Sequence, residues 1–168
     1  MTDISSLKML AGEWRLRLSQ LCRDCALADS GEQADMLRVA RALLAIIPEE
    51  AGGLVAGGAP SLHAFERLLE VGAWESAALD LMPEDATYML SRAGEGGCMA
   101  SLTLPGLEEE VTSEGDTPAM ALVSALAAAL AMLPADEARA IARSRHEDVA
   151  GRDSADGTAR RALMARLH

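Results

Sequence analysis

The chain has 168 residues, of which half are apolar and only 2% aromatic, so its core must be built from Leu, Ala, Met, Val and Ile. A chain of this length can bury roughly 70% of its unfolded surface, in one compact unit or in two small ones that share a core, and it needs no disulfides or structural metal. Plentiful leucine and 24% charged residues exclude global disorder.

The net charge of −11 is concentrated in the middle of the chain. Residues 1–60 carry six basic and eight acidic side chains, residues 61–116 carry two and twelve, and residues 117–168 carry seven and six. A strongly acidic surface repels phosphate and anionic lipid, so we expect no direct binding of nucleic acid and none of a membrane surface. The same surface attracts a basic partner, although acidity can also serve only to keep an Ala-rich protein in solution.

The sequence shows no sign of export or membrane insertion. No basic segment followed by an apolar run stands at the N-terminus, and the longest weakly polar stretch, residues 118–133, is short for a bilayer span. We therefore expect a cytoplasmic protein, in which the three cysteines are reduced thiols.

Two amphipathic helices are predicted within residues 1–50. Apolar residues recur every three or four positions from Ile4 to Cys25, and again from Ala34 to Ile47 before Pro48. Ser30 and Gln33 have the spacing of a capping box at the start of the second helix. Neither helix would be stable alone, so we expect an antiparallel helical hairpin that shares an apolar stripe.

A second module is predicted over residues 61–148, after a Gly-rich connection at 51–60. Helical periodicity resumes at Ser61, is interrupted near Gly72 and ends at Pro83. Beyond residue 148 we expect a polar and basic tail at 151–168.

The apolar period changes from helical to alternating after Pro83. Residues 86–91 and 98–104 alternate on either side of a Gly-rich turn, which predicts a β-hairpin, and residues 110–114 favour a third short strand. Such a sheet needs a covering helix. Residues 119–133 supply one, because they are apolar nearly all round and follow Asp116, Thr117 and Pro118, which are typical of a helix start. A charged surface helix is expected from Asp136 to about His146.

The fold class is thus α+β, mostly helical, with a small antiparallel sheet of two or three strands packed against helices.

The cysteines carry only a weak indication of chemistry. Cys22 and Cys25 have the C-x-x-C spacing of metal or redox sites, but both lie on the apolar stripe, so we expect buried core thiols. Cys98 with His63 would have the residue types of a nucleophilic pair, but a thiol at the start of a buried strand is the simpler interpretation. We expect no bound metal and no cofactor.

The acidic side chains of the middle third are the remaining candidates. Glu84 with Asp85, and the run Glu108 to Glu110, could hold a divalent cation or supply acid and base groups, but consecutive carboxylates in loops are usually solvated. We expect no catalytic residue among them. As partner-binding residues the sequence offers Glu84, Asp85, Glu108, Glu109, Glu110, Glu114 and Asp116.

Trp74 and Pro83 are followed by two alternating strands and by the segment 115–122, Gly-Asp-Thr-Pro-Ala-Met-Ala-Leu, which opens an Ala/Leu helix. With this order of features, residues 73–132 resemble the small phage and prophage proteins called phage ABA-sandwich domains. The resemblance implies a helix packed on a small antiparallel sheet and a viral or mobile-element origin, hence the cytoplasm of a bacterial host. The family supplies no catalytic residues.

These observations lead to two hypotheses of function. The first is a non-enzymatic phage or prophage accessory protein that binds another protein with a basic surface, and so inhibits a host defence or nucleic-acid-handling complex. The second is an assembly module that self-associates, for example as a homodimer, through its N-terminal helices.

Overall fold

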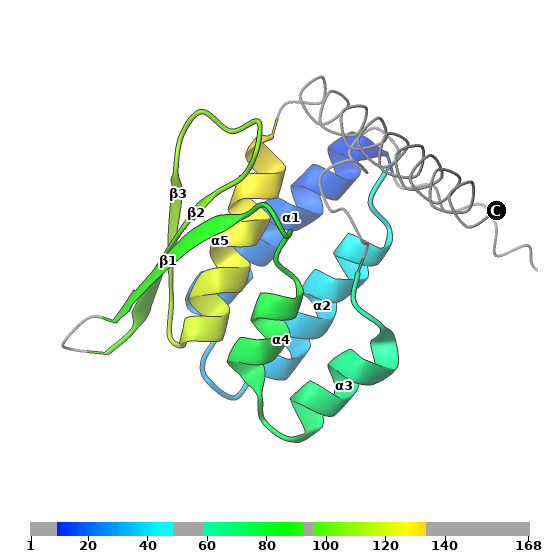
Figure 1. The fold of residues 1–168 in the computed structure, drawn as a ribbon, viewed down its shortest axis with the longest axis vertical. Helices are drawn as coiled ribbons and strands as arrows, with labels where there is room; N and C mark the ends of the chain where they lie inside the picture. The colour runs from blue at the N-terminus through cyan, green and yellow to red at the C-terminus, as the bar shows by residue number, and fades with distance from the viewer. Residues whose placement is uncertain (1–9, 49–58, 93–95, 134–168) are drawn as a thin grey trace, which may run out of the picture.

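The computed structural model describes residues 10–48, 59–92 and 96–133 (Figure 1). These residues form five helices and three strands, which confirms the expected α+β, mostly helical class. In chain order the elements are α1 (Ala11–Leu27), α2 (Gln33–Ala45), α3 (Leu62–Glu70), α4 (Trp74–Asp80), β1 (Thr87–Arg92), β2 (Cys98–Thr103), β3 (Val111–Gly115) and α5 (Pro118–Met132).

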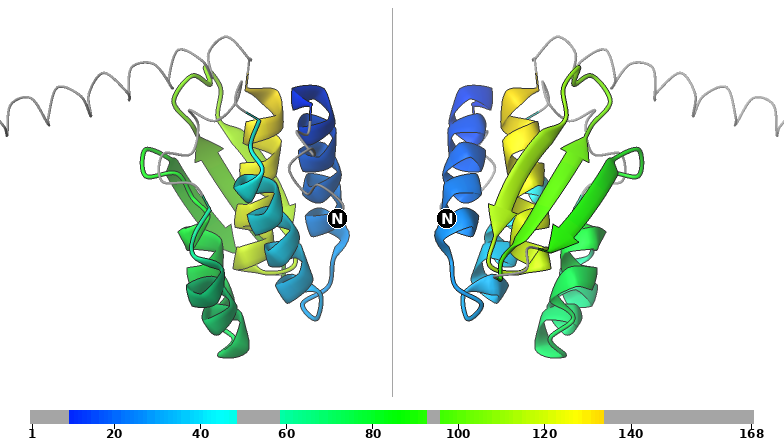
Figure 2. Two further views of the ribbon diagram at one scale, coloured as in Figure 1. Left: turned by 90° about the vertical axis from the view of Figure 1, so that its right-hand side faces the viewer. Right: turned by 90° about the vertical axis from the view of Figure 1, so that its left-hand side faces the viewer.

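The three strands form an antiparallel meander in the order β1-β2-β3. Thr87 pairs with Thr103 at one end of the hairpin and Arg92 with Cys98 at the other, without a bulge between them. The third strand expected from the sequence is present, with Leu102 paired to Val111 and Cys98 to Gly115. The helices lie behind one face of the sheet, and the opposite face is open in the part of the chain that the structure describes (Figure 2).

Helix α5 is the centre of the core. It lies between the sheet on one side and α1 and α2 on the other (Figure 2), which explains why nearly all of its side chains are buried. A helix surrounded by protein has no need of a polar face, so its Ala- and Leu-rich sequence, apolar nearly all round, fits this position.

The junction between β3 and α5 explains the sequence Gly-Asp-Thr-Pro-Ala. Thr117 is the N-cap of α5, its side chain accepts a hydrogen bond from the amide of Met120, and Pro118 occupies the first turn, as predicted. Gly115 packs so closely on this turn that an added Cβ would lie 2.5 Å from the backbone nitrogen of Ala121. Glycine is therefore required for the strand to reach the helix.

The N-terminal hairpin is closed by a buried tryptophan. The indole Nε1 of Trp14 donates a hydrogen bond of 2.9 Å to the carbonyl of Leu43, which joins α1 to α2. The same face of α1 buries Leu18, Leu21 and Cys25 in the common core with α5.

The expected capping box at Ser30 and Gln33 does not form. Asp29 and Glu32 close this turn instead: the Asp29 carboxylate accepts from the amide of Gly31, and the Glu32 carboxylate accepts from the amide of Asp29. Helix α2 begins at Gln33, whose buried side chain donates to the carbonyl of Ser30. Gln33 turns toward the core because its amide oxygen has a partner there, Thr117.

Helices α3 and α4 are separated at Gly72, as predicted, where φ is +71°. This conformation is easy for glycine and strained for other residues. An exposed ion pair of 2.9 Å between Arg38 and Glu66 connects α3 to α2, and the guanidinium of Arg41 donates to the carbonyl of Pro60.

Several expectations fall on residues outside the described ranges. These are the first turns of the N-terminal helix before Leu10, most of the Gly-rich connection at 51–60, the charged helix at 136–146 and the tail at 151–168.

Candidate functional site

The strand register brings five of the seven acidic candidates to one end of the sheet, which we call the acidic end: Glu84, Asp85, Glu108, Glu109 and Glu110. Glu84 and Asp85 lie in the turn before β1, and Glu108 to Glu110 directly precede β3. Because the meander is antiparallel, the starts of β1 and β3 lie at the same end, two strand spacings or roughly 10 Å apart.

Backbone hydrogen bonds to buried residues anchor the two loops that carry these carboxylates. The amide of Leu107 donates to the carbonyl of Leu104, which is buried, and this turn anchors the β2–β3 loop on the core. In the turn before β1, the amide of Ala86 donates to the carbonyl of the buried Pro83. The acidic residues that follow each anchor, Glu84, Asp85, Glu108, Glu109 and Glu110, are all exposed.

The segment of sequence that carries the acidic end contains little positive charge. Between Leu68 and Leu133, Arg92 is the only basic residue in the sequence. The register places it at the far end of β1, opposite Cys98. Like charges gathered at one surface produce a negative potential that attracts cations and basic proteins. Among the described residues, Arg15 of α1 is a cation near this end, because its guanidinium donates a hydrogen bond of 2.8 Å to the carbonyl of Leu133 at the end of α5.

Glu114 and Asp116 lie away from the acidic end. Glu114 pairs with Met99 near the end of β3, and Asp116 follows β3, so both are at the Arg92 end of the sheet. The structure therefore divides the seven candidates into groups of five and two.

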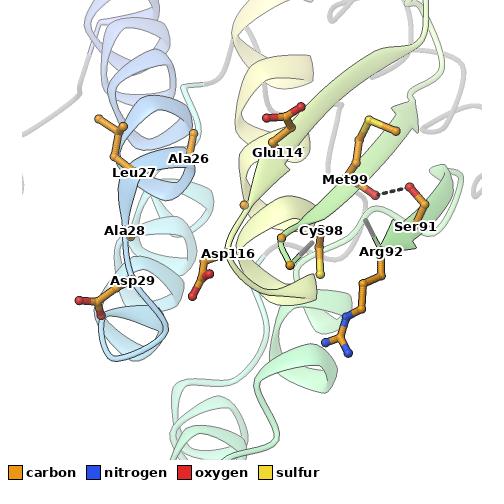
Figure 3. A pocket seen from close by; sticks show the side chains of 13 residues that line it. Ala26, Leu27, Ala28, Asp29, Ser91, Arg92, Cys98, Met99, Glu114 and Asp116 are labelled. Atoms are coloured by element: carbon orange, nitrogen blue, oxygen red, sulfur yellow. Dashed lines mark hydrogen bonds between the residues drawn. The ribbon is translucent and has the colours of Figure 1, made fainter. Parts of the chain in front are cut away.

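A hollow of about 760 Å³ opens at the Arg92 end, between the end of α1 and the sheet (Figure 3). Its rim carries Asp29, Glu114 and Asp116 as well as Arg92, and Cys98 lies in its wall. Asp29 already accepts a hydrogen bond from Gly31, so part of this charge serves the α1–α2 turn. The hollow mixes both signs of charge, unlike the acidic end.

The open face of the sheet is nearly uncharged. It presents Met89 and Met99 to solvent, and on the adjoining strands the hydroxyls of Ser101 and Thr112 lie 2.9 Å apart in a hydrogen bond. Glu114 is the charged residue of this face within the strands.

The cysteines lie in or beside the core. Cys25 is fully buried, and burial raises the pKa of its thiol from 9.0 to about 12. Cys22 is half-buried, with its sulfur 3.4 Å from the hydroxyl of Ser124 on α5. Cys25 thus has the buried core position predicted for both residues, whereas Cys22 is partly buried beside the core. Cys98 is buried at the start of β2, whereas His63 is exposed on α3.

Within residues 10–48, 59–92 and 96–133, no three His, Cys, Asp or Glu side chains gather in an arrangement that could hold a metal ion. None of the helices described is both long enough and apolar enough to span a membrane.

The apolar stripe of α1 packs against other helices of the same chain. Trp14, Leu18 and Leu21 are buried against α2 and α5, whereas Leu16 and Leu27 are the exposed large apolar residues of this helix. The described part of the α1 stripe is therefore buried in the core of the same chain.

Comparison with known proteins finds no match to this chain. No protein-family model matches the chain, no curated protein matches it, and no solved structure does.

Proposed function

We propose that this protein is a non-enzymatic accessory protein of a phage or prophage that binds a basic surface on another protein through the acidic end of its sheet. The observation that carries the proposal is the gathering of Glu84, Asp85 and Glu108 to Glu110, all exposed, at one end of a rigid sheet.

Rigidity supports a binding role. The two loops that carry the five carboxylates are short and are anchored on buried Pro83 and Leu104. The backbone that carries these charges is therefore ordered before a partner arrives, which lowers the entropy lost on association. Complementary charge accelerates the encounter and selects partners more than it adds affinity.

A basic protein surface is the partner that this chemistry favours. Protein surfaces that bind nucleic acid are rich in Lys and Arg. A compact row of carboxylates can therefore compete with phosphates for such a surface. The partner class is accordingly a nucleic-acid-handling or defence protein of the bacterial host, which the acidic end would occupy and inhibit. The phage or prophage origin is supported by the resemblance of residues 73–132.

The proposal is tested by affinity capture. The tagged full-length chain is incubated with lysate of its bacterial host at low and at raised salt, and the retained proteins are identified by mass spectrometry. We expect a protein with a basic surface that is retained in stoichiometric amount at low salt and released as screening increases. Retention that is indifferent to salt, or capture of an acidic protein, would contradict the proposal.

A further inference from the structure

Strand β1 is an open sheet edge whose six residues, Thr87–Arg92, are all exposed. Its neighbour β2 is largely buried, and the opposite edge strand β3 contacts both α1 and α5. Soluble proteins usually protect an open edge with lysine, proline, a bulge or a very short strand. Strand β1 contains neither Lys nor Pro and pairs with β2 in unbroken register, and its charged residue, Arg92, stands at its last position beside the hairpin turn.

The edge also carries apolar side chains that the described part of the chain leaves exposed. Tyr88 and Leu90 lie on the same face as Leu102 and Ala100, their buried partners on β2. They remain 45% and 40% exposed because α5 packs mainly on β2 and β3. On the other face Met89 is 65% exposed.

We propose that a second copy of this chain covers this edge, and that two β1 strands pair antiparallel about a two-fold axis at Met89. This arrangement joins two three-stranded sheets into one of six strands and satisfies the free backbone groups of both edges. The interface is isologous, as expected for a two-fold dimer.

The register about Met89 is self-complementary. It places Met89 opposite Met89 of the second copy, and Tyr88 opposite Leu90 twice, so apolar residues face each other on both sides of the sheet. Thr87 then faces Ser91, and no like charges meet within the paired strands.

Charge complementarity favours the same register. Arg92, the only basic residue between Leu68 and Leu133, comes opposite Ala86 of the second copy, directly after Glu84 and Asp85. Two chains of net charge −11 repel each other over most of their surfaces. At this edge the register instead brings Arg92 of each copy to the acidic turn of the other.

The oligomeric state of the full-length chain tests the inference. Light scattering coupled to size-exclusion chromatography, over a wide range of concentration, should show a species of twice the chain mass of 17.6 kDa. Met89→Lys places two like charges at the two-fold axis, so this variant should be monomeric, and so should Met89→Glu. An equimolar mixture of the two should recover the dimer, because opposite charges then face each other.

Met99→Lys is the matched control, since Met99 is exposed on the same face but on the central strand. It should dimerise as the unmodified chain does. A monomeric unmodified chain, a dimer that survives Met89→Lys, or a mixture that stays monomeric would each overturn the inference.

A second variant keeps the test independent of any effect of lysine on folding. The register places the two Cβ atoms of residue 89 about 5 Å apart. Met89→Cys should therefore form an intermolecular disulfide under mild oxidation, and Met99→Cys should not. Equal cross-linking of the two variants would contradict the register.

The dimer and the proposed partner respond differently to salt. Screening should change self-association little, because it weakens both the attraction of Arg92 to the acidic turn and the repulsion between the two acidic chains, while the apolar and hydrogen-bonded contacts remain; it should release a basic partner. The two proposals can therefore fail separately.

Discussion

The amide oxygen of Gln33 accepts a hydrogen bond of 2.8 Å from the hydroxyl of Thr117, 84 positions later in the chain. Thr117 in turn caps α5, and Gln33 donates to the carbonyl of Ser30 at the start of α2. One short polar chain thus links the beginnings of two helices that pack together. Such partly buried networks are stabilising only when every member is satisfied.

Replacing Thr117 by valine should lower the free energy of unfolding by about 1–2 kcal/mol, because it removes an N-cap and leaves the Gln33 oxygen without its donor. Thr103→Val, at an exposed position of β2, is the matched control and should be nearly neutral. Urea unfolding of both variants measures the difference. Equal stability would mean that the link contributes nothing.

Gly115→Ala should destabilise the protein by about 1–3 kcal/mol or more, because the new Cβ would overlap the backbone of α5 at Met120 and Ala121. Gly12→Ala, in α1, meets nothing within 4 Å and should be neutral or slightly stabilising. Thermal unfolding of the pair separates a steric requirement at residue 115 from a general response to alanine. A tolerant Gly115 would contradict the close packing of β3 on α5.

The start of α5 and the β-hairpin were predictable from sequence because their determinants are local. Thr117 and Pro118 define a helix start within a few residues, and alternation with a Gly-rich turn defines a hairpin. The cap of α2 was predicted at the wrong residues because Gln33 is recruited by Thr117, a contact that no local pattern reveals.

The acidic end was only partly predictable. The sequence indicated which residues carry the charge, but the division between Glu108 to Glu110 and Glu114 depends on the register and direction of the strands. The exposure of Tyr88 and Leu90 was not predictable either, because their alternating pattern is the same as that of a covered strand. It depends on where α5 crosses the sheet.

The buried thiol of Cys25 should make the protein sensitive to alkali. Its pKa is raised to about 12 by burial, with smaller contributions from Cys22 and Asp24, so the folded state keeps a proton that the unfolded state loses near pH 9. The contribution of the protonated Cys25 thiol to the free energy of unfolding is fully present below pH 9 and is lost as the pH rises toward 12.

Between pH 8 and pH 10, the unmodified chain should therefore lose about 1 kcal/mol more than Cys25→Ala, which has no thiol at this position. Denaturant unfolding at the two pH values measures this difference. If the difference in free energy of unfolding between the two proteins were the same at both pH values, the pKa of the Cys25 thiol would not be raised.

Trp14→Phe should lower the free energy of unfolding by about 1–3 kcal/mol, because the carbonyl of Leu43 loses its buried donor and a small cavity opens. Leu16→Ala, on the exposed side of α1, should change it by less than about 0.5 kcal/mol. Neither should alter the dimer fraction measured by light scattering. A change in oligomeric state at unchanged stability would instead favour association through the helical hairpin.

The most direct test of the acidic end compares two variants of equal charge in the capture experiment. In the first, Glu108, Glu109 and Glu110 become glutamine; in the second, the exposed residues Glu70, Glu75 and Asp80 of the α3–α4 region become glutamine or asparagine. The first variant should bind the basic partner about tenfold more weakly, because it loses three surface ion pairs of about 0.5 kcal/mol each, and the second should bind as the unmodified chain does. Equal binding by the two variants, whether both are retained or both are lost, would contradict the proposed role of the acidic end.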